Sequence, residues 1–131
     1  MAVRDVMQRD VTSVQARSTI REFVTSVAAH HRHTVFPVYE GDKVAGTISV
    51  SDVSRVAPEA WDKTIVGELA DHGAIRVMED CDLSEALRLL VRERGAQMLL
   101  VTDSKGALQG IVTKTDILRA VRVSSGAPKG H

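Results

Sequence analysis

The sequence has almost no aromatic residues, because Phe, Tyr and Trp together make up only 3% of its 131 positions. Its core must therefore be built from Val, Ile, Leu and Ala, and an apolar content of 44% is sufficient for this. Cysteine occurs once, as Cys81, so no disulfide can form within the chain. A single cysteine is typical of a protein from a reducing compartment, and no convincing base stands beside Cys81 to make it a nucleophile.

An excess of charge of either sign is also missing, because 17 Lys and Arg balance 17 Asp and Glu. A neutral chain without a long basic run argues against a nucleic acid as its main partner. Long apolar runs are absent as well, and the charged residues Arg4, Asp5, Arg9 and Asp10 interrupt the region where a signal peptide would stand. We therefore expect a soluble, cytoplasmic protein without a membrane partner.

The familiar motifs of catalysis and of phosphate-binding loops are missing too. The sequence contains no P-loop, no GxGxxG, no GxSxG and no CxxC, and we expect no enzyme activity. His30, His31 and His33 allow a metal site, but no Cys or acidic cluster with ligand spacing accompanies them. Because these histidines fall at a predicted helix end, where they also favour the helix dipole, we expect no metal there.

What the sequence does contain is an internal repeat. GTISVSD begins at Gly46 and GIVTKTD begins at Gly110, so the two phrases are 64 residues apart. Upstream of the phrases the two copies align at an offset of 63, so one residue was gained between them. The chain is a tandem duplication of a unit of about 60 residues, a length that is marginal for an independent fold. We expect the two units to share one core.

Both copies have the same order of predicted elements: a short strand, a helix, two strands and a second helix. Apolar residues at 20, 23, 24, 27 and 28, and again at 83, 86, 87, 90 and 91, have the spacing of one helix face. Thr19 and Glu22 form a capping-box pattern at the start of the first helix. The predicted fold class is α+β. The predicted boundaries are repeat 1 at 1–57, a connector at 58–63, repeat 2 at 64–122 and a disordered tail at 123–131.

The repeated phrase combines three residue types that suit a nucleoside phosphate. A Gly within a strand marks the close approach of another backbone or of a ligand. A hydroxyl residue stands where the strand gives way to a helix, whose free N–H groups suit a phosphate, and an Asp three residues later can accept both hydroxyls of a ribose. These residues are Gly46, Ser49 and Asp52 in the first copy and Gly110, Thr113 and Asp116 in the second.

A simpler interpretation of the phrase stays open at this point. Ser49 or Thr113 could only cap a helix, with the Asp placed to favour the helix dipole. However, bare capping does not require the same Gly, hydroxyl and Asp in two copies that otherwise differ at most positions. The duplication therefore favours a ligand site.

A helix, two strands and the pattern G-h-x-[ST]-x-x-D, duplicated in tandem, resemble a pair of CBS domains, the module named after cystathionine β-synthase. The resemblance covers about residues 3–121, and HTVFPVYEGDKVAGTISVSDV is similar to the family's strand–strand–helix run, including Pro37. It implies two tandem βαββα CBS repeats packed through their sheets as one sandwich-like, pseudo-twofold module, commonly associated as a disc-shaped homodimer. The second copy departs from this pattern, because Leu100-Val101 replaces the Pro-Val pair.

The resemblance also implies clefts that bind AMP, ADP, ATP or S-adenosylmethionine as a regulatory ligand, with no required cofactor. Lys114 could compensate phosphate charge in such a cleft or could simply be a solvated lysine at a helix start. Carried over by position, the ribose residues are Asp52 and Asp116, the phosphate or ribose residues are Ser49, Thr113 and Lys114, and the adenine residues are Ser13, Val14, Arg76, Val77, His33 and Gln97.

The function that the resemblance implies is a regulatory module for energy sensing. Such a module senses the level of an adenine nucleotide and signals to an unknown effector protein through a change of shape or association. The alternative is a structural or protein-interaction module whose clefts hold no nucleotide.

Overall fold

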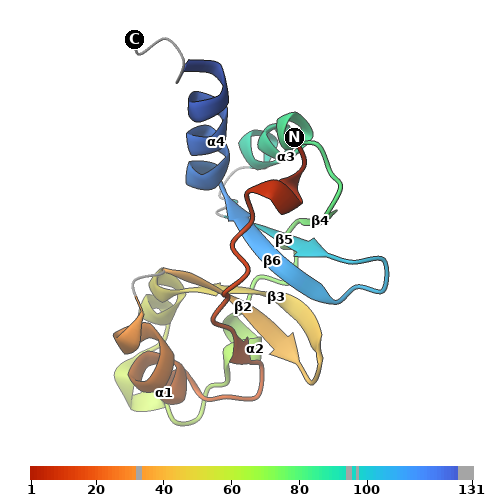
Figure 1. Cartoon of the computed structure of the whole chain (residues 1–131). Helices are drawn as coiled ribbons and strands as arrows, with labels where there is room; N and C mark the ends of the chain where they lie inside the picture. The colour runs from red at the N-terminus through yellow and green to blue at the C-terminus, as the bar shows by residue number, and fades with distance from the viewer. Residues whose placement is uncertain (32–33, 94–95, 97, 127–131) are drawn as a thin grey trace. The chain divides into compact units, whose positions relative to one another are not determined.

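The computed structural model describes residues 1–31, 34–93, 96 and 98–126 (Figure 1). The chain divides into two compact units. Unit 1 consists of residues 1–10 and 75–131, and unit 2 consists of residues 11–74. We call residues 1–10 and 64–74, which begin repeat 1 and repeat 2, the leading segments. Each compact unit therefore contains the leading segment of the other repeat.

Unit 2 is built on a three-stranded sheet in the order β1-β2-β3. Strand β1 runs parallel to β2, and β3 runs antiparallel to it after a turn in which Gly41 has a φ of 66°. Irregular helices surround the sheet. The elements are β1 (Val14–Gln15), α1 (Ile20–Glu22), the π-helix η2 (Phe23–Val27), β2 (Val35–Glu40), β3 (Lys43–Ser49), α2 (Val66–Leu69) and the 3-10 helices η3 (Ala28–His30), η4 (Val50–Arg55) and η5 (Pro58–Ala60).

Unit 1 repeats this plan with longer helices. Its sheet has the order β4-β5-β6, with β4 parallel and β6 antiparallel to β5. The last helix reaches Gly126, so residues 123–126, which we predicted as tail, are helical. The elements are the 3-10 helix η1 (Val3–Asp5), β4 (Arg76–Met78), α3 (Leu83–Arg92), β5 (Met98–Thr102), β6 (Leu108–Thr113) and α4 (Lys114–Gly126).

The predicted fold class is confirmed, since each unit combines helices with a three-stranded sheet in the predicted order. The capping box at the first helix is also present: the N–H of Glu22 donates to Thr19 Oγ1 at 3.1 Å, and the N–H of Thr19 donates to Glu22 Oε1 at 2.8 Å. This start is local in sequence, which explains why the pattern predicted it.

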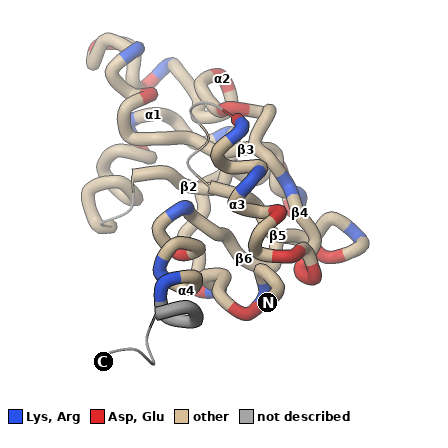
Figure 2. Tube along the Cα trace, turned by 90° about the horizontal axis from the view of Figure 1, so that it is seen from above, with Lys and Arg blue, Asp and Glu red and all other residues tan. Residues whose placement is uncertain are grey.

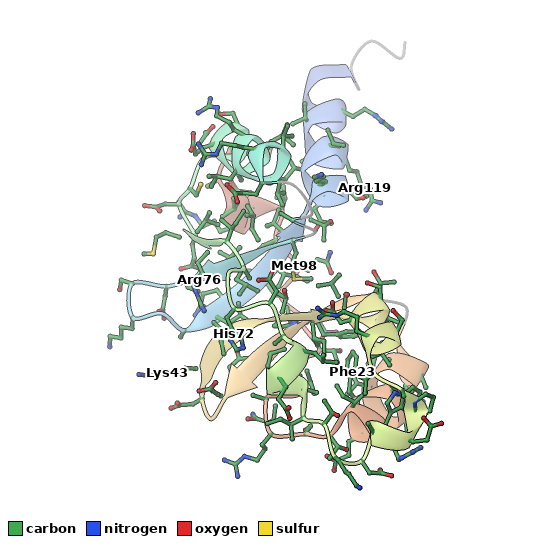
Figure 3. The ribbon with its side chains drawn as sticks, turned by 180° about the vertical axis from the view of Figure 1, so that it is seen from behind. Phe23, Lys43, His72, Arg76, Met98 and Arg119 are labelled. Carbon is green, nitrogen blue, oxygen red and sulfur yellow. The ribbon has the colours of Figure 1, made fainter. Side chains whose placement is uncertain are left out.

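Most of the buried hydrophobic residues form two clusters, one in each unit, and a core shared by the two units stays a prediction. In unit 2, Phe23 and Phe36 are fully buried, and their rings meet edge to face at a centroid distance of 5.5 Å (Phe23 is labelled in Figure 3). In unit 1, Leu90 and Leu99 are fully buried in a cluster of aliphatic side chains and Met7, without an aromatic residue. Scarce aromatic residues are thus concentrated in unit 2.

One predicted core position is wrong. Val91 was placed on the buried face of its helix, but it is 65% exposed. In α3 the buried residues are Leu83, Ala86 and Leu90. At 100° per residue, the eighth residue after Leu83 has turned about 80° from it, so Val91 lies at the margin of the buried stripe.

The leading segments complete the sheets and the clusters of their units. Gln8 exchanges two backbone hydrogen bonds with Ile111 of β6, at 2.9 and 3.0 Å, and Asp71 does the same with Thr47 of β3, at 2.7 and 3.1 Å. In Figure 1 the segment at the N-terminus, in red, lies along β6. Val3 and Met7 are buried in unit 1, as Val66 is in unit 2.

The turn between β5 and β6 leads to a prediction on acid stability. The backbone N–H groups of Ala107 and Lys105 donate to Asp103 Oδ1, at 2.9 and 2.8 Å, and hold the pKa of this carboxyl below its usual value. A lowered folded pKa stabilises the protein above the unfolded pKa of about 3.9, and this stability is lost as the pH falls through the folded pKa. We expect Asp103→Asn to lower the melting temperature at neutral pH and to weaken its dependence on pH below about 4. Melting curves of both proteins from pH 7 to pH 2 measure this.

The matched control is Asp42→Asn, in the corresponding turn of repeat 1. Among the described residues, none donates a hydrogen bond to the Asp42 side chain. Equal pH profiles for the Asp103 variant and the unchanged protein would contradict the prediction.

Candidate functional site

The sheet topology brings the predicted adenine and phosphate residues to the same end of each sheet. In unit 2, Ser13 directly precedes β1, and Ser49 ends β3. Because β1 is parallel to β2 while β3 is antiparallel to it, the start of β1 and the end of β3 meet at one sheet end, with β2 between them. The same register places Arg76 and Thr113 at one end of the unit 1 sheet.

The residues on the first strands differ in what they can offer to a ligand. The side chains of Val14 and Val77 belong to the buried clusters, so these residues present main-chain groups only. Ser13 and Arg76 are exposed, and Arg76 is labelled in Figure 3. The two other adenine candidates, His33 and Gln97, lie outside the described residues.

The hydroxyl and the Asp of the phrase form a capping box in both copies. In unit 2, the N–H of Ser49 donates to Asp52 Oδ2 at 2.8 Å, and the N–H of Asp52 donates to Ser49 Oγ at 3.2 Å. In unit 1, the equivalent distances for Thr113 and Asp116 are 3.0 and 3.2 Å. The phrase therefore caps the following helix in both units, and this capping uses one oxygen of each carboxylate.

The two carboxylates differ in their remaining contacts. Asp52 Oδ1 accepts a hydrogen bond from Arg55 Nη2 at 3.1 Å. Asp116 Oδ2 accepts a second hydrogen bond, from Gln8 Nε2 at 2.9 Å, and no described residue donates to Asp116 Oδ1. The first copy thus has an ion pair, and the second copy has an amide donor and an open oxygen.

Neither Arg55 nor Gln8 was predicted from the sequence as a partner of these carboxylates. A signal for Arg55 was present, because Arg119 stands equally three residues after its Asp in the second copy. No sequence signal pointed to Gln8, because it belongs to the leading segment of the other repeat and is 108 positions away from Asp116. Only the exchange of leading segments brings these two side chains together.

The motif glycines make room for a backbone. A Cβ on Gly110 would lie 2.5 Å from the carbonyl oxygen of Gln8, and a Cβ on Gly46 would lie well inside contact distance of the carbonyl oxygen of Asp71. Of the two explanations for a strand glycine, approach of a chain segment and approach of a ligand, the structure shows the first. The glycines therefore serve the site indirectly, by letting the leading segments dock.

The starts of the two following helices are unequal. In unit 1, Lys114 is the exposed first residue of α4, which has 13 residues. In unit 2, the same position is Val50, and the helix that begins there is η4, a 3-10 helix of six residues. Figure 2 shows the Lys and Arg positions of α4 in blue. Of these two helix starts, only the one beside Thr113 therefore has a cation and the dipole of a longer α-helix.

An open pocket of about 390 Å³ lies at the other end of the unit 2 sheet. It is formed by the ends of β1 and β2 and by α2, and no residue of our predicted ligand site lines it. Tyr39 forms part of its wall, and burial raises the pKa of the Tyr39 hydroxyl. The lining also includes Gln15, Ala16, Arg17, Glu40, Gly41, Ile65, Gly67, Glu68 and His72.

Other candidate chemistry is weak in the described part of the chain. Within the ranges that the structure describes, no three His, Cys, Asp or Glu side chains are grouped to hold a metal ion. Burial and the nearby carboxylates, Glu85 first among them, raise the pKa of the Cys81 thiol, which disfavours the reactive thiolate. Among the helices of the described residues, none has the length and apolar character needed to span a bilayer.

Comparison with known proteins shows relatives over most of the chain. An uncharacterized protein of Methanopyrus kandleri is 32% identical over 122 residues, which cover 91% of this chain and 62% of that protein. In two further relatives, both from Methanocaldococcus jannaschii, the matched region makes up 39% and 32% of the relative's own length. The chain thus spans less than two thirds of the length of these relatives.

Solved structures agree with the fold described above. The CBS domain of a bacterial CNNM/CorC family Mg²⁺ transporter, determined in complex with ATP, has a TM-score of 0.85 and 23% identity, with 92% of this chain and 87% of that chain covered. CBSX2, determined in complex with AMP, has a TM-score of 0.77 and 24% identity, with coverage of 92% and 95%. At these identities the likeness establishes the fold.

The family model of the CBS domain matches the sequence twice, at residues 3–59 and 66–123. The two matches follow the tandem repeat that the duplicated phrase predicts, and each contains the Gly, hydroxyl and Asp of its copy. This chain belongs to the CBS domain family and carries a tandem pair of its domains.

Proposed function

We propose that the chain is a regulatory module that binds an adenosine-containing ligand and signals its level to a partner protein. The ligand classes are AMP, ADP, ATP and S-adenosylmethionine. The observation that carries this proposal is that, in both units, an Asp carboxylate and a hydroxyl lie at the sheet end where the first strand begins. The solved CBS structures with ATP and with AMP support the choice of ligand.

In the proposed site, different residues contact the ribose, the phosphate groups and the adenine. The Asp carboxylate accepts hydrogen bonds from the ribose hydroxyls, because an ionised carboxylate only accepts. The hydroxyl residue and, in unit 1, Lys114 contact phosphate oxygens at the helix start. Main-chain groups of Val14 and Val77, together with Ser13 and Arg76, line the adenine. No residue in this arrangement is placed for catalysis, and we propose a cytoplasmic, non-enzymatic role.

Association is the proposed route from ligand to signal. In unit 1, Val91 of α3 and Leu118 of α4 are 65% and 50% exposed, although they are large and apolar. We propose that such helix surfaces meet in a homodimer, so that ligand binding changes the association with a second copy or with an effector protein.

A structural module without a physiological nucleotide is the second candidate function. The observation that favours it is the ion pair of Asp52 with Arg55, together with the capping boxes, since these contacts already use much of the hydrogen-bonding capacity of the phrase. On this alternative, the phrase serves folding and the exposed helices serve contact with other proteins.

A melting experiment with matched variants separates the two candidates. We expect AMP, ADP, ATP or S-adenosylmethionine to raise the melting temperature, because a ligand at a hundredfold excess over Kd adds about 2.7 kcal/mol to the free energy of unfolding. The double variant Asp52→Asn/Asp116→Asn removes both negative charges and should lose this shift. The control variant Asp42→Asn should keep it. A melting temperature that none of the four ligands changes would support the structural module instead.

A further inference from the structure

We propose that the two sites are unequal: the chain takes one adenosine phosphate, at Asp116 in unit 1, while Arg55 occupies the equivalent position at Asp52 in unit 2. This inference rests on the proposed function, because it assigns the ligand class and the occupancy of the same sites.

The Asp52 carboxylate has a protein partner on both oxygens. Oδ2 accepts the N–H of Ser49 at 2.8 Å, and Oδ1 accepts Arg55 Nη2 at 3.1 Å. The same Arg55 nitrogen donates to the carbonyl oxygen of Leu69 at 3.1 Å, at the end of α2. This one guanidinium nitrogen therefore has two protein acceptors, and a ribose diol must displace it to reach Asp52 Oδ1.

The Asp116 carboxylate is held in place through only one of its two oxygens. Both of its protein hydrogen bonds, from Thr113 N–H at 3.0 Å and from Gln8 Nε2 at 2.9 Å, go to Oδ2. No donor from the described residues reaches Oδ1. The backbone of Gln8 is itself bonded to Ile111, which anchors the base of this side chain beside Asp116, and the amide hydrogen bond then orients the carboxylate.

The residue equivalent to Gln8 in unit 2 cannot do the same. Asp71 is the counterpart of Gln8, because the two residues are separated by the repeat offset of 63. Each of them forms a backbone bridge to the sheet of its unit. The Asp71 side chain accepts the N–H of Gly73 at 2.9 Å. A carboxylate has no hydrogen to donate to Asp52, so a positioning amide exists in unit 1 only.

Charge at the helix start favours an anionic ligand in unit 1. Lys114 begins the 13-residue helix α4, whereas unit 2 has Val50 and the six-residue η4 at the same place. Arg119, the counterpart of Arg55, forms no ion pair within the described part of the chain and is exposed on α4 (Figure 3). The Lys114 cation and the dipole at the helix start suit phosphate groups, whereas S-adenosylmethionine has a sulfonium cation and no phosphate.

Calorimetric titration of the full chain with ATP, with AMP and with S-adenosylmethionine tests this inference. We expect one ATP per chain, bound more tightly than S-adenosylmethionine. Asp116→Asn should weaken ATP binding about tenfold or more, because it removes a charged acceptor, and it should weaken binding more than Asp52→Asn does. The control variant Asp42→Asn should leave the affinity within about twofold. Lys114→Ala should weaken ATP more than AMP.

Two further variants test the assigned roles of Arg55 and Gln8. Arg55→Gln removes the ion pair and should strengthen the weaker second site by about twofold to fivefold, the range expected for an exposed pair, so that a second equivalent appears at high ATP. Gln8→Met keeps the shape of the side chain without its donor and should weaken the first site, while Gln8→Asn, which keeps an amide, should retain more of the affinity. Melting curves without ligand check that each variant is folded.

The possible outcomes separate this inference from the proposed function. If none of the three ligands binds, the proposed function fails, and the inference fails with it. If ATP binds but two equal sites appear, or if Asp52→Asn removes binding while Asp116→Asn does not, the inference alone is overturned. Preference for S-adenosylmethionine over ATP would also overturn it. Should Asp116→Asn not fold, the comparison of Lys114→Ala with Asp52→Asn decides between the sites.

Discussion

Gly46→Ala is expected to lower the free energy of unfolding by about 3 kcal/mol, the upper part of the range for forcing extra atoms into a packed site. The new Cβ would collide with the backbone carbonyl of Asp71 and come within 3.1 Å of His72 Cα. Backbone atoms cannot rotate away as a side-chain end can, so the leading segment of repeat 2 must move. The two hydrogen bonds that Asp71 exchanges with Thr47 would then be strained or broken. Urea unfolding followed by circular dichroism measures the loss.

Gly73→Ala is the matched control, because it makes the same change in the same leading segment. The nearest atom to its new Cβ is Asp71 Oδ1 at 3.4 Å, an ordinary contact, so its stability should stay within about 0.5 kcal/mol of the unchanged protein. If Gly46→Ala proved as stable as Gly73→Ala, the close approach of the Asp71 backbone would be disproved.

A repeat 2 fragment of residues 64–126, extended to the end of α4, is expected not to form a stable fold. It lacks residues 1–10, which supply the buried side chains of Val3 and Met7 to unit 1 and the backbone partner of Ile111. Burying two such side chains contributes about 3–6 kcal/mol, which is comparable to the total stability of a small domain, about 5–15 kcal/mol. Circular dichroism and the dispersion of amide signals in NMR spectra measure the degree of folding.

The control fragment is unit 1 as one chain, with residues 1–10 joined to residues 75–126 through a flexible Gly/Ser linker. It has nearly the same length as the repeat 2 fragment but contains the leading segment that the structure assigns to this unit. We expect it to unfold cooperatively in urea, at a higher concentration than the repeat 2 fragment. A repeat 2 fragment that folds as well as the linked unit would show that the exchanged segments are dispensable.

The order of elements could be predicted from the sequence because its causes are local. Apolar spacing and the capping box at Thr19 and Glu22 involve residues a few positions apart, and so do the turns at Gly41 and Gly106, whose φ values are 66° and 86°. Because the unit is duplicated, each pattern occurs twice, and the second copy supports the interpretation of the first. The exposure of Val91 was not predicted, because a periodic pattern does not show where the buried stripe of the helix ends.

The candidate site was predictable in its residue types but not in its contacts. The repeated phrase indicated Asp52 and Asp116, yet it could not show that Arg55 bonds the first carboxylate and Gln8 the second. It also could not show whether a ligand or a backbone required the glycines. These differences between the two copies arise from residues outside the phrase.

The sequence by itself determined the duplication, the α+β class and the family, since each of these is written in short-range patterns that occur twice. Only the tertiary structure decided which leading segment completes which sheet, because the pairing of Gln8 with Ile111 joins residues far apart in the chain. Two copies of similar sequence offer similar sheet edges, and the local pattern of a segment is the same whichever edge it joins. Packing of the whole chain makes that choice, and with it the choice of Gln8 as the neighbour of Asp116.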